Sequence, residues 1–114
     1  MHRDAAYLLD ILLHAKDAQD FTNNMDKEAF FEDYKCQMAV IRCLEVMGEA
    51  VKRLSKDIQK EHPEIPWSSI AGMRDILIHA YNKVDLEEVW NTVKQDIPML
   101  IPILEEMTPP NDEM

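Results

Sequence analysis

The chain has 114 residues, of which 30% are charged and only 2 are glycine, and it carries a formal net charge of −10. This length fits a single domain, and the scarcity of glycine favours helices over a β-rich fold. The charge excludes a domain that binds nucleic acid through a broad basic surface. Residues 36–84 hold 7 basic and 6 acidic groups, net +1, whereas residues 85–114 hold 1 and 8, net −7. Any phosphate chemistry would therefore depend on a local site in the middle of the chain.

The first predicted helix spans residues 4–22, where apolar residues recur at helical spacing. They are Leu8, Ile11, Leu12, Ala15 and Ala18. The apolar stretch over residues 5–13 is interrupted by Asp10 and followed by charged residues. It is too short and too charged for a signal peptide or a membrane span. We therefore expect a soluble, cytoplasmic protein.

The longest predicted helix spans residues 33–61 and follows a short helix that Asp26 can cap. Its apolar residues recur at alternating steps of four and three, which places them on one helix face. They are Val40, Leu44, Met47, Val51, Leu54 and Ile58. A face this wide must pack against two neighbours, or against one neighbour and a second subunit. Cys36 and Cys43 lie roughly 10.5 Å apart by helix rise, too far to bridge each other, so we expect free thiols.

Proline residues mark the next helix boundary. Pro63 ends the long helix, and Pro66 is placed to begin a helix over residues 67–81. Gly72 lies in the middle of that helix, where glycine destabilises by about 0.5–1 kcal/mol. A close backbone contact at Gly72 is the expected compensation.

The last predicted helix begins at Asp85, which forms a capping-box pattern with Glu88. Pro98 and Pro102 should kink this helix, because each removes an internal hydrogen bond. We expect one helical domain over residues 1–108 and a disordered tail over residues 109–114.

Three reactive side chains occur together in the apolar segment that contains Arg74, His79 and Tyr81. Arginine can bind a phosphate through two parallel hydrogen bonds, and histidine can take or give a proton near neutral pH. On an ideal helix Arg74 and His79 would lie about 140° apart. One cleft holds both only if it is wide or if a second subunit contributes a wall. The alternative is structural, with Arg74 paired locally and His79 packed.

Cleavage of RNA by its own 2′-oxygen needs a base, an acid and stabilisation of negative charge. His79 suits the base or acid role and Arg74 the stabilising role. Since one histidine cannot easily serve as both base and acid, a symmetric homodimer is expected to pair two copies of the motif. Asp75 lies four residues before His79 and could orient its imidazole, or could instead pair with Arg74. The remaining histidines form no metal-ligand pattern, so neither a metal nor another cofactor is expected.

The R-x4-H-x-Y pattern resembles the signature of the HEPN ribonuclease superfamily, and more narrowly the toxin of HEPN/MNT toxin–antitoxin pairs, often called HepT. The resemblance extends over nearly the whole chain, from Arg3 to about Glu106. The stretches that carry it are residues 42–55, 63–67, 70–74 and 84–93. It implies an all-α, antiparallel helical bundle that forms a homodimer with a composite cleft. In that superfamily a polar residue, often asparagine, stands where this chain has Asp75.

The same resemblance implies a toxin that acts as a metal-independent endoribonuclease, with Arg74 and His79 as catalytic residues. It also implies that a minimal nucleotidyltransferase (MNT) antitoxin transfers AMP to Tyr81 and thereby silences the toxin. Two alternatives remain open. The chain could be a non-catalytic helical subunit that presents a nucleotide or a tyrosine to a nucleotidyltransferase partner, or a purely structural dimeric scaffold.

Overall fold

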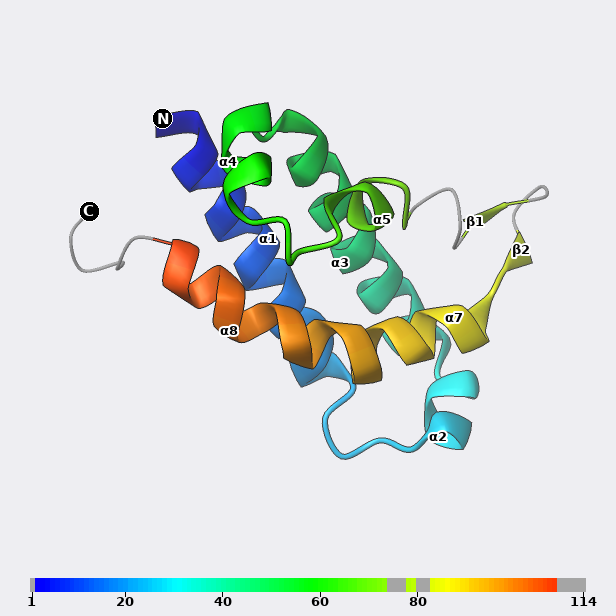
Figure 1. The fold of residues 1–114 in the computed structure, drawn as a ribbon. Helices are drawn as coiled ribbons and strands as arrows, with labels where there is room; N and C mark the ends of the chain where they lie inside the picture. Colours follow the sequence, from blue (N-terminus) through cyan, green and yellow to red (C-terminus); the bar gives the residue numbers. More distant parts are fainter. Residues whose placement is uncertain (1, 74–77, 80–82, 109–114) are drawn as a thin grey trace.

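The computed structural model describes residues 2–73, 78–79 and 83–108, and it is all-α apart from one short pair of strands (Figure 1). The helices are α1 (His2–Phe21), α2 (Lys27–Phe31), α3 (Tyr34–Arg53), α4 (Lys56–Glu61), α5 (Trp67–Ala71), α7 (Leu86–Asn91) and α8 (Ile97–Met107). A π-helical segment, Thr92–Asp96, joins α7 to α8. The strands are β1 (Ile78–His79) and β2 (Lys83–Val84). The predicted all-α fold is confirmed.

The centre of the fold is the antiparallel pair of α1 and α3, which α7 and α8 cross on one face (Figure 1). Both long helices bury the faces that their periodicity predicted. Ile11 and Ala15 of α1, and Val40 and Leu44 of α3, have no exposed surface. Burial of a large aliphatic side chain contributes about 1.5–3 kcal/mol, so this interface makes a large contribution to the stability of the domain.

The wide apolar face of α3 finds both of its neighbours within the chain, because α1 packs on one side and α5 on another. α3 lies very close to α5 at Gly48, where a Cβ atom would lie 2.9 Å from the carbonyl oxygen of Ile70. The expectation that Gly72 provides such a contact is wrong. Gly72 ends α5 as its C-terminal cap, and a Cβ there would be at an ordinary 3.4 Å from the Ser68 oxygen.

The predicted helix over residues 33–61 is two helices, because α3 stops at Arg53 and α4 begins after Ser55. Leu54 leaves the helical conformation, with φ −68° and ψ 146°. The Ser55 hydroxyl accepts a hydrogen bond from the Ile58 amide, and its own amide and hydroxyl donate to the carboxylate of Asp4. Serine capping of a new helix, reinforced by an acceptor from α1, competes with continuation of the old one.

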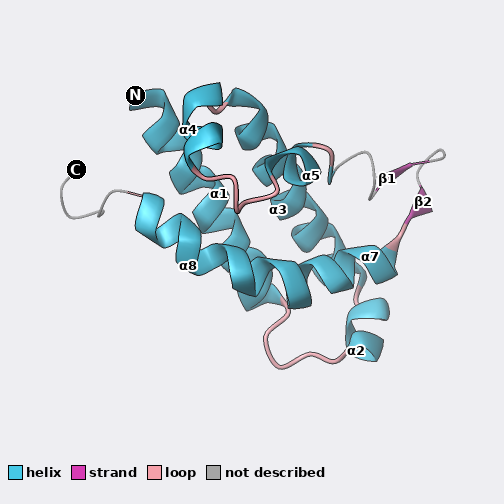
Figure 2. Ribbon diagram, in the orientation of Figure 1, coloured by secondary structure: helices cyan, strands magenta, loops and turns pink. Residues whose placement is uncertain are grey.

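The predicted helix over residues 67–81 is wrong at residues 78 and 79, which form β1, while residues 74–77 and 80–81 lie outside the described residues. α5 is only five residues long, and β1 pairs with β2 in antiparallel register, Ile78 opposite Val84 and His79 opposite Lys83 (Figure 2). Gly72 ends the helix, and β-branched residues such as Ile78 and Val84 favour extended structure.

The C-terminal helix begins as predicted, since the Asp85 carboxylate accepts from the Glu88 amide. Its interior is interrupted by the π-helical segment, which ends just before Pro98 in the first turn of α8. Proline has no amide hydrogen, so the regular hydrogen-bond pattern cannot continue through this position. None of the described helices has the length and apolar character needed to cross a bilayer. The predicted tail, residues 109–114, lies outside the described residues.

Candidate functional site

Of the four predicted site residues, the structure describes only the backbone of His79, which lies in β1 and pairs with Lys83. Arg74, Asp75 and Tyr81 lie outside the described residues. Since His79 is in a strand, helical geometry does not relate it to Arg74, and the separation of about 140° expected for a helix does not apply. The segments on either side of the motif are described in full, and they determine where it lies in the fold.

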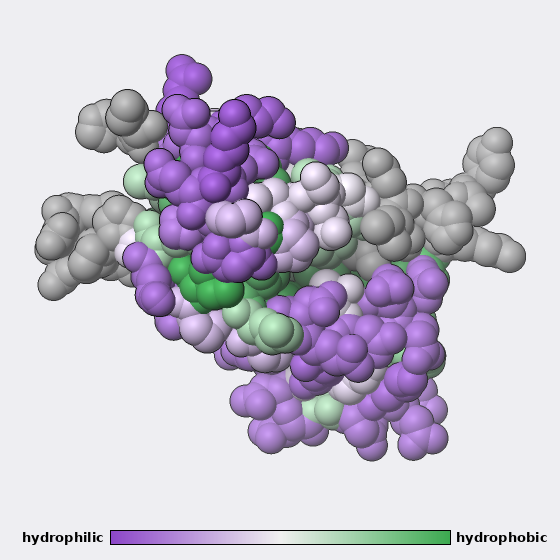
Figure 3. Space-filling model, viewed as in Figure 1, coloured by the Kyte–Doolittle hydropathy of each residue, from purple (hydrophilic) through white to green (hydrophobic). Residues whose placement is uncertain are grey.

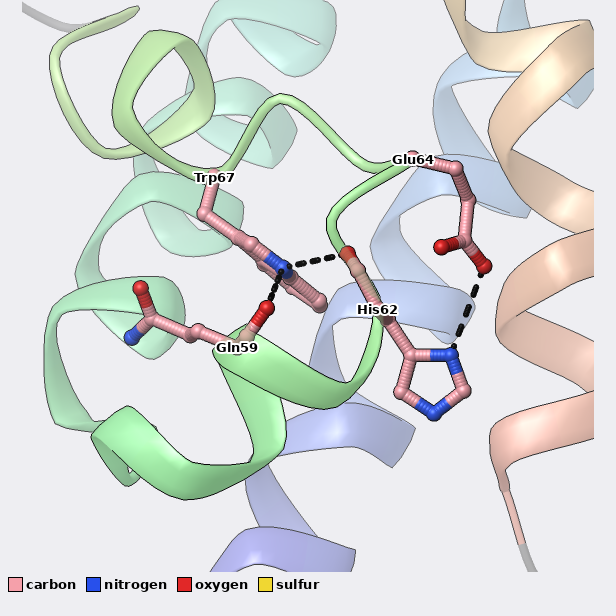
Figure 4. A network of polar contacts seen from close by, with 4 residues as sticks. All are labelled: Gln59, His62, Glu64 and Trp67. Atoms are coloured by element: carbon pink, nitrogen blue, oxygen red, sulfur yellow. Dashed lines mark hydrogen bonds and ion pairs between the residues drawn. The ribbon is translucent and has the colours of Figure 1, made fainter.

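The segment that leads into the motif is held by α5. Met73, one residue before Arg74, is only 8% exposed, and Ile70 is buried against α3. Trp67 begins α5, and its ring N–H lies 3.1 Å from the Gln59 carbonyl oxygen and 3.0 Å from that of His62 (Figure 4). This donor therefore adds a second hydrogen bond to two carbonyls at the C-terminal end of α4, which also accept from the His62 and Ile65 amides.

A second polar contact in the same loop joins the His62 ring to the Glu64 carboxylate, 3.4 Å from Nδ1 to the nearer oxygen (Figure 4). Together with the indole hydrogen bonds it ties the connection between α4 and α5 to both helices. The segment that precedes the motif is therefore packed against the core and held by hydrogen bonds.

The segment that leaves the motif is held by α7, which follows β2 directly. The Lys27 ammonium of α2 forms an ion pair with Glu87, and the rings of Phe30 and Trp90 have centroids 5.4 Å apart. Lys94 lies 5.0 Å from the centre of the Trp90 ring and donates to the Thr22 carbonyl at 2.8 Å. A lysine over an aromatic face adds about 0.5–2 kcal/mol, depending on burial. Both ends of the motif are therefore anchored to the core.

The antiparallel pair of β1 and β2 is called the hairpin below. A cavity of about 480 Å³ opens beside it, between the first half of α3 and the start of α7. It is lined by Tyr34, Gln37, Met38, Ile41, Arg42, Glu45, Val84 and Leu86. The Arg42 side chain is 74% exposed and lies 3.7 Å from Glu45, while Tyr34 is 71% exposed. The Glu45 side chain is only 21% exposed, so the arginine is the exposed member of the pair and its guanidinium is accessible to a ligand.

Sequence reasoning missed Tyr34 and Arg42 as candidate binding residues. The available signal was their spacing, because Tyr34, Met38 and Arg42 recur at steps of four along one helix and therefore lie near one another. A solvated helix face carries the same pattern, so the spacing alone does not distinguish the two. Among the described residues, no group of three histidine, cysteine or acidic side chains is placed to hold a metal ion.

An all-α domain of crossed antiparallel helices, with its R-x4-H-x-Y segment between a short helix and the last long helix, defines a HEPN-type domain. The chain belongs to the family described as ribonuclease HepT-like, whose match spans residues 11–107. The family and fold implied by the sequence motif are confirmed.

Several relatives are similar over most of their length. A Thermococcus cleftensis protein named "Probable ribonuclease HepT" is 50% identical over 99 residues, which is 87% of this chain and 88% of that protein. A Methanocaldococcus jannaschii protein provisionally named as an RNase is 52% identical over 93 residues, 82% of this chain and 80% of its own. A second provisionally named RNase of that organism is 50% identical over 93 residues, 82% and 77% of the two chains. No solved structure matches this chain.

Proposed function

We propose that this protein is the toxin of a toxin–antitoxin pair and cleaves RNA as a metal-independent endoribonuclease. The observation that carries the proposal is the position of Arg74 and His79 within the family match over residues 11–107. Relatives with about half of their residues in common carry ribonuclease names. The anchored flanks on α5 and α7 support a site of defined geometry, which catalysis by positioned side chains requires.

The proposed reaction is transfer of the phosphodiester to the neighbouring ribose oxygen. His79 of one subunit takes the proton from the 2′-hydroxyl, and the 2′-oxygen attacks phosphorus. The bond to the 5′-oxygen breaks as the second subunit's His79 protonates that oxygen, leaving a 2′,3′-cyclic phosphate. Arg74 stabilises the additional negative charge on the phosphorane through bidentate hydrogen bonds.

The proposed reaction needs two copies of the motif, and the surface beside the hairpin supports a homodimer at that position. α1 and α5 already cover the wide apolar face of α3. A second copy would therefore pack on the exposed side of this helix. Tyr34 and Met38 are exposed there, next to the partly buried Val84 and Leu86. A second copy packed on this surface by a twofold axis would bring two hairpins together. Light scattering that shows a monomer at micromolar concentration would contradict the shared cleft.

The test of the chemistry compares Arg74→Ala and His79→Ala with two matched controls. Both variants should lose RNA cleavage while keeping the helical circular dichroism of the wild type. Arg53→Ala at the end of α3, and His14→Ala on α1, remove the same residue types outside the motif and should retain activity. Cleavage should persist in EDTA and leave a cyclic phosphate. Loss of cleavage in EDTA, or full activity of His79→Ala, would overturn the mechanism.

Control by a nucleotidyltransferase antitoxin is the second part of the proposal. The Tyr81 phenolic oxygen would attack the α-phosphorus of ATP, lose its proton and release pyrophosphate. The attached AMP would place negative charge and a bulky base beside the cleft and repel RNA. Mass spectrometry after incubation with the partner, ATP and Mg²⁺ should find AMP on the Tyr81 peptide. Tyr81→Phe should abolish the modification, and Tyr7→Phe, which removes a hydroxyl from a partly buried tyrosine of α1, should not. Neutralisation of an unmodified toxin would show steric control instead.

A non-catalytic role as the partner-binding subunit of a nucleotidyltransferase complex is the second candidate. Asp75 favours it, because a carboxylate beside Arg74 can pair with the guanidinium and repel phosphate. Growth inhibition and RNA cleavage by the chain expressed alone separate the two roles, since only the toxin produces both. Asp75→Asn should increase cleavage if the carboxylate opposes the phosphate.

A further inference from the structure

A second, larger cavity of about 560 Å³ lies on the other side of α5, between that helix and the α7–α8 arm. Its apolar lining consists of Pro66, Ile70, Met73, Ile97, Met99, Leu100 and Ile103. Figure 3 shows hydrophobic surface at this position, bordered by hydrophilic residues. Met99 is 72% exposed, which is unusual for a large apolar side chain beside other apolar groups. The core already packs without this groove being filled.

The charged residues that line this groove are all acidic. They are Glu64 from the loop before α5, Glu88 from α7 and Asp96 from the end of the π-helical segment, and no Lys, Arg or His lines the cavity within the described part of the chain. Glu64 also contacts the His62 ring, while the Asp96 side chain makes no capping hydrogen bond to α8. Carboxylates on a low-dielectric apolar wall repel phosphate and attract cations. The groove is therefore unsuited to RNA.

We propose that this groove docks a basic amphipathic helix of a partner protein, with apolar side chains in the groove and lysine or arginine residues at its acidic rim. Recognition of an amphipathic helix by an apolar groove is a recurring binding mode, and complementary charge gives it orientation and selectivity. The volume lies within the range of roughly 300–1,000 Å³ that small-molecule pockets occupy, so it accepts a few anchoring side chains. The proposal concerns binding alone and does not depend on ribonuclease activity.

The groove is connected to the motif through one residue. Met73 lines the groove and immediately precedes Arg74 in the chain. A bound helix that packs on Met73 would restrain the segment that enters the motif. Docking could therefore change the position of Arg74 without blocking the cleft.

The probe is a synthetic helical peptide of leucine and lysine residues arranged on opposite faces, labelled with a fluorophore. Anisotropy with the full chain should show binding that weakens as salt rises, and the same peptide with glutamate in place of lysine should not bind. The double variant Glu88→Gln/Asp96→Asn should weaken binding about five- to tenfold, because each exposed ion pair contributes up to about 1 kcal/mol. The double variant Asp20→Asn/Glu49→Gln makes the same change in net charge on α1 and α3 and should bind as the wild type does.

Two further variants test the groove itself. Ser69→Trp places a large ring from an exposed position of α5 into the cavity, and Met99→Lys adds a cation to its rim. Both should abolish peptide binding while circular dichroism stays unchanged. Equal losses in the two double variants would show general attraction to an acidic protein and would overturn the proposal, as would tight binding to Ser69→Trp. A dimer of the protein that Ser69→Trp dissociates would identify a second copy as the occupant instead.

Discussion

Replacement of Gly48 by alanine should destabilise this protein, although alanine is the better helix former. In the interior of a helix the change from glycine to alanine is worth about 0.5–1 kcal/mol. Here the added Cβ atom would lie 2.9 Å from the Ile70 oxygen and 3.4 Å from the Ala71 oxygen. Both are backbone atoms, so no side chain can rotate away and α5 must move. Overpacking of this kind costs about 1–3 kcal/mol.

The net destabilisation is therefore about 1 kcal/mol, which corresponds to a decrease in Tm of about 4 °C for a domain of this size. Urea titration followed by circular dichroism measures it, and Gly72→Ala is the matched control. A Cβ atom at Gly72 would meet the Ser68 oxygen at 3.4 Å, an ordinary contact, so this variant should change stability much less. Since α5 leads to Arg74, RNA cleavage by folded Gly48→Ala should also fall. An increase in Tm for Gly48→Ala would refute the close packing of α3 and α5.

Two further predictions follow from individual ionisable groups. Burial, with a smaller effect from the Asp17 charge, raises the pKa of the Cys43 thiol to about 11. A thiol reagent near pH 8 should therefore modify Cys43 only after denaturation and Cys36 sooner, and rapid labelling of both would contradict the burial. Hydrogen bonds from the Ser55 hydroxyl and amide lower the pKa of the Asp4 carboxyl. The stability that this gives is complete above the unfolded pKa and is lost as pH falls through the folded one, so Asp4→Asn should weaken the acid dependence of unfolding; an unchanged pH profile would refute it.

The helices at the centre of the fold were predictable because their signals are local. Apolar periodicity located α1 and the first part of α3, and the side chains of Asp26 and Asp85 cap the helices that they were expected to begin. Each of these features depends on residues within one or two turns of the chain. Local spacing and capping chemistry are therefore sufficient to predict them.

The breaks in the predicted helices depend on information that periodicity does not contain. Ile58 continues the apolar pattern of α3, yet the helix ends before Ser55, whose amide is bound by Asp4 from a distant part of the chain. Gly72 was interpreted as a residue in the middle of a helix, although glycine is far more common at the end of a helix, where it caps α5. The β1–β2 pairing makes the backbone at His79 a strand where a helix was predicted.

For the candidate site, the sequence predicted the residues but not their arrangement. The identities of Arg74, His79 and Tyr81 came from a short motif and a family resemblance, and the family is confirmed. Helical spacing does not give their mutual geometry, because the backbone at His79 is a strand that pairs with Lys83. Tyr34 and Arg42 were not predicted. An exposed aromatic or cationic side chain on α3 becomes a candidate binding residue only when the fold places the hairpin beside it.

The distribution of charge reconciles an acidic chain with a proposed RNA site. The acidic excess of the last thirty residues includes the carboxylates of Glu88 and Asp96, which line the groove between α5 and the α7–α8 arm. Arg42 lies on another surface, beside the hairpin that contains His79. Repulsion between exposed charges is screened over about 8 Å at physiological ionic strength, whereas a guanidinium–phosphate contact acts at hydrogen-bonding distance. One small domain can therefore combine an acidic apolar face with a separate face on which Arg42 exposes its guanidinium.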